Sequence, residues 1–127
     1  MNQTADLLDI VQTMERLVGQ SDWVAAANYF TPQALYKVAD REPVYGIEDI
    51  EHYMVWQNSL VQWKGHDMKL VVSQDNALVV EVDSFFFRLK DQANIVVPCT
   101  DIYRFEGSKI NDWRVYANIS AFGLPSA

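Results

Sequence analysis

The sequence predicts an α+β domain in which about three N-terminal helices pack on a curved antiparallel sheet. Up to Val61, apolar residues recur at helical spacing, whereas from His66 onward they alternate with polar residues as in half-buried strands. The connections between these later strands are short and rich in Asp, Asn and Gly, and such links join antiparallel neighbours. Helices grouped first and strands last indicate α+β architecture.

Length and composition indicate one globular domain over residues 1–127, with enough apolar residues for a core. Half of the residues are apolar and 13% are aromatic, which excludes general disorder. The net charge is −7 and no basic cluster is present, so we expect no nucleic-acid partner. No stretch approaches the roughly 20 apolar residues of a membrane span, so we expect no membrane partner either.

Cysteine usage and the first residues bear on the compartment. Cys99 is the single cysteine, so no intrachain disulfide can form, which fits a reducing cytoplasm. The opening "MNQTADLLDI" has an acid in place of a basic region and reads as a helix, so we expect no signal peptide. The sequence therefore predicts a cytoplasmic location.

Three helices are expected before the sheet. The first covers roughly Ala5–Val18 with Thr4 as its cap, and the second covers residues 22–30 with Ser21 as its cap. The third follows Gly46 and continues for about four turns. The apolar stripes are Leu7, Val11, Met14 and Val18 in the first helix, and Ile47, Ile50, Met54 and Val61 in the third.

Five strands are expected. A short one covers residues 34–40 and is followed by a loop at residues 41–46. The other four cover residues 66–73, 77–89, 94–105 and 109–120. In the last of them Trp113, Val115, Ala117 and Ile119 share one face, and Arg114, Tyr116 and Asn118 share the other.

Three segments, "DWVAAANYFTPQAL", "PVYGIEDIEHY" and "YRFEGSKINDWRVY", resemble framework motifs of the nuclear-transport-factor-2-like superfamily. Polyketide cyclases of the SnoaL type, limonene-epoxide hydrolase and ketosteroid isomerase belong to this superfamily. The resemblance covers about Asp6 to Phe122 and implies that sheet and helices form a cone whose open end is a small-molecule pocket. Enzymes, binding modules and association domains share this scaffold, so the resemblance does not fix an activity.

The resemblance also assigns the two faces of the last strand. It turns Trp113 and Val115 toward the pocket, and Arg114, Tyr116 and Asn118 outward. Because family members often pair through the outer sheet face, these outward residues are expected to form a homodimer interface. Simple solvation of that face is the alternative.

On the same scaffold Glu81, Asp83 and Phe85 would face the pocket. Residues i and i+2 of a strand lie about 7 Å apart, so two desolvated carboxylates there would repel, and one would hold a proton near neutral pH. The next strand would contribute Cys99 and Asp101 on the same side.

The pattern of the strand at residues 77–89 leaves a second alternative open. Val80, Val82 and Phe86 can be the buried face, which would leave Glu81 and Asp83 in water. The other candidates also have structural explanations. A buried hydrogen bond explains Asp101, a satisfied core hydroxyl explains Tyr36, and Cys99 suits a small buried hydrophobe. His52 and His66 are expected at the surface, and no spacing indicates a metal site.

The predicted function is a small-molecule-binding, SnoaL-like protein that acts as an enzyme by proton transfer without a cofactor. The reaction would be isomerisation, dehydration, cyclisation or hydrolysis of a small, partly apolar ligand. Asp83 would be the base, Asp101 a protonated donor to developing oxyanion charge, and Tyr36 the group that orients the ligand. Glu81 would perturb Asp83. The pocket wall would comprise Trp113, Phe85, Val38, Val115, Cys99 and Met54.

A noncatalytic ligand carrier, sensor or dimerisation module is the alternative function, because no family mechanism transfers intact. In the strand motif of the epoxide hydrolase, the arginine corresponds to Glu81 here. Of the three roles in ketosteroid isomerase, the proton-donating aspartate has a match in Asp101, whereas the companion tyrosine falls at about Met14.

Overall fold

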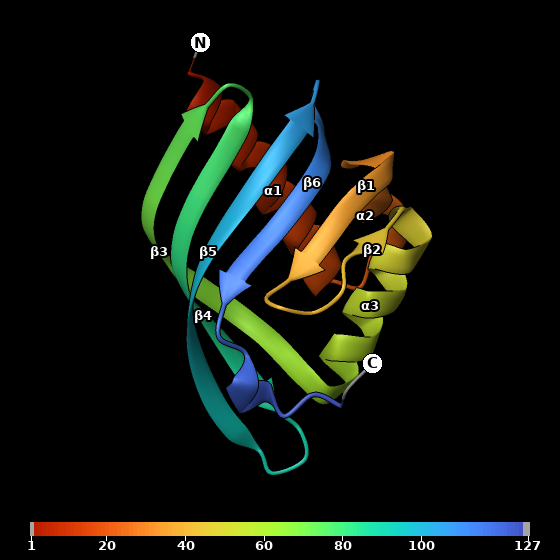
Figure 1. Cartoon of the computed structure of the whole chain (residues 1–127), viewed down its shortest axis with the longest axis vertical. Coiled ribbons are helices and arrows are strands. Elements are labelled where there is room, and N and C mark those ends of the chain that lie inside the picture. The colour runs from red at the N-terminus through yellow and green to blue at the C-terminus, as the bar shows by residue number, and fades with distance from the viewer. Residues whose placement is uncertain (1, 126–127) are drawn as a thin grey trace.

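The computed structural model describes residues 2–125 and has the expected α+β architecture (Figure 1). The chain forms three helices and one six-stranded sheet, and two of the strands precede the third helix. In chain order the elements are α1 (Gln3–Gly19), α2 (Trp23–Ala27), β1 (Phe30–Val38), β2 (Val44–Tyr45), α3 (Ile47–Leu60), β3 (Val61–Gln74), β4 (Ala77–Arg88), β5 (Ala93–Glu106), β6 (Lys109–Ala117) and a 3-10 turn (Ser120–Phe122).

The strands form one curved, unclosed sheet in the order β2-β1-β6-β5-β4-β3. All neighbours are antiparallel except β1 and β6, which pair in parallel. Figure 1 shows β3 running diagonally from the end of α3 to the opposite edge of the sheet, with α1 lying behind the strands. The four strands from β3 to β6 make the predicted antiparallel meander.

The helix boundaries follow from their caps. The Asn2 side chain caps α1 by accepting from the Thr4 backbone N–H at 3.0 Å, whereas the predicted cap, Thr4, lies inside the helix. Asp22 rather than Ser21 caps α2 by accepting from the backbone N–H of Ala25 at 3.2 Å. Gly46 is the cap residue directly before α3. Its φ is 87°, a positive value that glycine adopts without strain.

The structure corrects three expected boundaries. The second helix was expected to continue to Phe30 but ends at Ala27, and Phe30 to Pro32 belong to β1, where an irregular register between Phe30 and Leu35 accommodates the proline. The predicted loop at residues 41–46 contains the short strand β2. Val61 was assigned to the third helix but is the first residue of β3, which begins earlier than expected.

The core fills the space between the concave face of the sheet and the helices. Its fully buried members include Met14 of α1, Leu78 of β4, Tyr103 of β5 and Ile110 of β6. On β6, Trp113 is 7% exposed and Tyr116 is 53% exposed, so the predicted facing of this strand is confirmed. No helix within residues 2–125 is long and apolar enough to cross a membrane.

Candidate functional site

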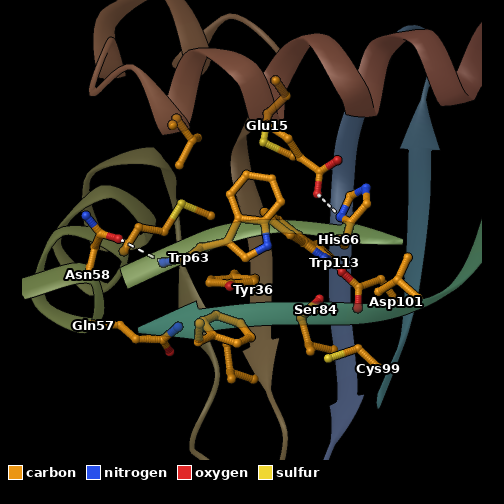
Figure 2. Close-up of a pocket in the computed structure, with 18 of the residues that line it drawn as sticks. Glu15, Tyr36, Gln57, Asn58, Trp63, His66, Ser84, Cys99, Asp101 and Trp113 are labelled. Atoms are coloured by element: carbon orange, nitrogen blue, oxygen red, sulfur yellow. Dashed lines mark hydrogen bonds and ion pairs between the residues drawn. The ribbon is translucent and has the colours of Figure 1, made fainter. Parts of the chain in front are cut away.

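A cavity of about 320 Å³ lies between α1, α3 and the concave face of the sheet. This volume is near the lower end of the range of small-molecule pockets, which is about 300–1,000 Å³. Figure 2 shows Glu15, His66 and Asp101 at one end of the cavity, and Gln57 and Asn58 at the other. Because Asn58 is exposed and Asp101 is mostly buried, the Asn58 end is the mouth and the carboxyl end is the interior.

Most of the predicted site residues line this cavity. Tyr36, Asp101 and Trp113 are in its wall, from β1, β5 and β6. The other predicted wall residues found there are Val38, Met54, Cys99 and Val115.

Glu81, Asp83 and Phe85 are not in the wall, so their predicted facing is wrong. In the β4–β5 register Val80 pairs with Asp101 and Asp83 pairs with Pro98. The cavity side of β4 therefore carries the other parity, Val80, Val82, Ser84 and Phe86. The outward carboxylate of Asp83 lies 3.7 Å from Lys69 Nζ on the outer face.

Asp101 is the aspartate at the interior end. Its Oδ2 accepts hydrogen bonds from the Tyr103 hydroxyl and from Trp113 Nε1, each at 3.2 Å. Its Oδ1 is buried and has no hydrogen-bond donor among residues 2–125. Burial raises the pKa of Asp101 to about 6, although the two hydrogen bonds favour the charged form and limit the rise.

Glu15 of α1 is a second cavity carboxyl that the sequence analysis missed. Its side chain is 15% exposed, and burial together with repulsion from Asp101 raises its pKa to about 8. A signal was available, because Glu15 follows Val11 by four residues and so belongs to the apolar stripe of the helix.

His66 of β3 was expected at the surface, but it lies in the cavity wall and faces Glu15. Its Nδ1 lies 3.9 Å from Glu15 Oε2, and Figure 2 shows the two side chains pointing toward one another. Burial lowers the pKa of His66 and raises that of Glu15, so both groups are mostly neutral at pH 7. At this pH the contact is therefore not an ion pair.

Aromatic rings form the middle of the wall. Trp113 lies between Tyr36 and Tyr103, with ring centroids 4.5 Å and 5.0 Å away. Burial raises the pKa of both phenols well above the usual value, so both stay protonated throughout the physiological range. Burial also raises the pKa of the Cys99 thiol to about 11, which makes it a poor nucleophile.

The sequence matches the SnoaL-like domain family over residues 11–113. The chain belongs to this family. No curated protein matches the sequence of this SnoaL-like protein.

Several solved structures have a similar fold. A proposed polyketide cyclase from Xanthomonas campestris pv. campestris has a TM-score of 0.83 at 12% identity, and the match covers 95% of this chain and 96% of that one. An epoxide hydrolase of the LEH-like type from M. tuberculosis has a TM-score of 0.77 at 10% identity, covering 96% and 90%. A protein with a ketosteroid isomerase-like fold from Catenulispora acidiphila, in complex with trimethylamine, has a TM-score of 0.78 at 16% identity, covering 91% and 93%.

These TM-scores establish the fold of the SnoaL-like protein. At such low sequence identity they do not indicate a particular reaction. The fold is consistent with a small-molecule-binding domain. Among residues 2–125 no group of three or more His, Cys, Asp or Glu side chains could hold a metal ion.

Proposed function

We propose that this SnoaL-like protein is an enzyme that binds a small, partly apolar molecule and transfers a proton on it without a cofactor. One observation carries the proposal: two buried carboxyls line the same cavity, and their pKa values are about 6 for Asp101 and about 8 for Glu15. At pH 7 Asp101 is mostly a carboxylate and Glu15 mostly an acid. Such a pair supplies a general base and a general acid together.

The base role falls to Asp101, because Asp83 faces away from the cavity. Hydrogen bonds from Trp113 and Tyr103 orient its carboxylate. In the reaction that we propose, Asp101 removes a proton from a carbon next to a carbonyl, while Glu15 donates its proton to the carbonyl oxygen as charge develops there. When the substrate has a carbon–carbon double bond beside that carbon, Asp101 returns its proton to the far end of the resulting dienol, and the dienol hydroxyl returns its proton to Glu15. These two transfers complete an isomerisation and restore both carboxyls.

Deuterium exchange tests this proposal without a known substrate. Small cyclic ketones, with and without an amino substituent, would be incubated with protein in D2O, and exchange next to the carbonyl would be followed by proton NMR. We expect catalysed exchange with wild type, and a loss of about a hundredfold with Asp101→Asn or Glu15→Gln.

Asp83→Asn is the matched control for this experiment, since it makes the same chemical change on the outer face. The Asp83→Asn protein should catalyse the exchange at the wild-type rate. Equal rates for Asp101→Asn and wild type would contradict the assignment of the base.

A noncatalytic ligand-binding protein is the second candidate function. The Catenulispora protein in complex with trimethylamine favours it, since a protein with a similar fold holds a small molecule. Ligand binding that persists in Glu15→Gln, with no catalysed exchange in wild type, would support this candidate.

We also propose that two copies pair through the outer face of the sheet. Tyr116 is 53% exposed and Val96 is 57% exposed on that face, with Arg114 and Asn118 beside Tyr116 along the strand. Large groups with an apolar body and a polar end suit interfaces. Native mass spectrometry should show a dimer at micromolar concentration that Tyr116→Asp weakens, and a monomer for wild type would refute the pairing.

A further inference from the structure

At neutral pH the carboxylate at the interior end of the cavity is not balanced by a nearby cation of residues 2–125. Its acidic and basic wall residues are Glu15, Lys64, His66 and Asp101. Glu15 and His66 are mostly neutral there, for the reasons given above. Lys64 is exposed, and its Nζ lies 6.0 Å from the ring centroid of Phe87, a residue outside the wall. The carboxylate of Asp101 therefore has no cationic partner within the cavity.

The hydrogen bonds of Asp101 do not remove this imbalance. Both of its donors, the Tyr103 hydroxyl and the Trp113 indole N–H, are neutral groups and reach one oxygen only. The other oxygen is buried without a donor from the described part of the chain. Buried charges are normally paired, and buried acceptors normally have a donor. The site is thus incomplete in both charge and hydrogen bonding.

The rest of the wall suits an organic cation. Figure 2 shows the rings of Tyr36 and Trp63 in the middle of the cavity, between the mouth and the Asp101 end. Aromatic faces attract cations, and the attraction is stronger when the cation is desolvated. Aromatic ring faces and aliphatic side chains pack well on hydrocarbon, which suits an organic cation.

We propose that this cavity takes a small protonated amine whose ammonium group lies against the Asp101 carboxylate and whose apolar part packs on the aromatic and aliphatic wall. The inference rests on the same site as the proposed function and names the class of its ligand. A protonated amine supplies an N–H donor to the Asp101 oxygen that lacks one, which a quaternary ammonium ion cannot do. The volume of about 320 Å³ limits the ligand to a small molecule.

Cyclohexylammonium and cyclohexanol are matched probes, because they have the same ring and differ in charge. Their affinities at pH 7.5 would be measured by calorimetry and by 15N-resolved NMR titration of the full chain. We expect the amine to bind at least about tenfold more tightly than the alcohol, with shifts at the cavity residues. In Asp101→Asn the advantage should disappear, whereas Asp83→Asn should retain it.

A second variant guards against misfolding of Asp101→Asn. Trp63→Leu removes a partly exposed ring and keeps the carboxylate, and we expect it to weaken the amine several-fold more than the alcohol. Equal affinities of both probes in wild type would overturn the amine inference and leave the proton-transfer proposal standing. The same holds if neither probe binds while ketones without an amino group still exchange. Loss of both binding and exchange would overturn both proposals.

Discussion

Asp83 and Asp101 lie on neighbouring strands, yet they belong to different environments. Asp83 points to the outer face, where its side chain is 38% exposed and has Lys69 within 3.7 Å. Asp101 points into the cavity, where burial raises its pKa to about 6. The same side chain is thus a solvated charge on one face and a candidate base on the other. The difference shows that sheet register, and not residue type, decides which acid can do chemistry.

The largest effect should separate the two faces of β6. Trp113→Ala should cost about 3–5 kcal/mol of unfolding free energy, because it empties a buried site between Tyr36 and Tyr103. Tyr116→Ala, on the exposed face of the same strand, should change the monomer by about 0.5 kcal/mol or less. Urea unfolding of both variants measures this difference, and similar losses would contradict the assigned faces.

An intermediate effect should come from Glu15, the cavity acid with the higher pKa. The folded state raises its pKa from 4.5 to about 8, so between these values the folded protein binds more protons than the unfolded chain. Stability contributed by this group is therefore present below pH 4.5 and is lost as pH rises through 8. Glu15→Gln should be more stable than wild type at pH 9, by about 2–4 kcal/mol, and nearly equal at pH 4.

Unfolding curves at several pH values check this expectation. Asp101 also contributes stability that is lost as the pH rises from 3.8 through about 6. His66 has the opposite effect below pH 6.5, because burial lowers its pKa. The difference between wild type and Glu15→Gln isolates the glutamate. A stability difference between the two proteins that does not change with pH would refute the raised pKa of the buried Glu15 carboxyl.

The smallest effect should come from the outer aspartate. Asp83→Asn removes the charge partner of Lys69, and exposed pairs of this kind are worth about 0.5 kcal/mol. It should leave the carbon-13 titration of the Glu15 carboxyl unchanged. Asp101→Asn should instead lower the pKa of Glu15 below about 8, because a nearby negative charge is lost. A shift of equal size in both variants would erase the distinction between the faces.

Much of this fold could be predicted from the sequence. The period-two alternation in β6 correctly put Trp113 and Tyr116 on opposite faces, and the family resemblance correctly turned Trp113 inward. The same resemblance placed Asp101 and Tyr36 on the cavity side of their strands, where the structure has them.

The facing of β4 could not be decided locally, because both parities of residues 77–87 contain apolar side chains. The family resemblance then favoured the parity with Glu81 and Asp83. In the structure β4 pairs with β5 so that Val80 is opposite Asp101, and this pairing spans both strands. Glu15 was not predicted for another reason. A single acid within the apolar stripe of a helix does not indicate a site until the strands that face it are known.

The parallel pairing of β1 with β6 has a consequence for synthesis of the protein. The first strand of the sheet hydrogen-bonds to the last one, and the antiparallel strand β2 is its other neighbour. A nascent chain that has emerged as far as β5 therefore lacks the element that joins β1 to the rest of the sheet. It also lacks Trp113, which holds Asp101. The cavity, with Asp101 held in its wall, can thus form only after β6 has left the ribosome.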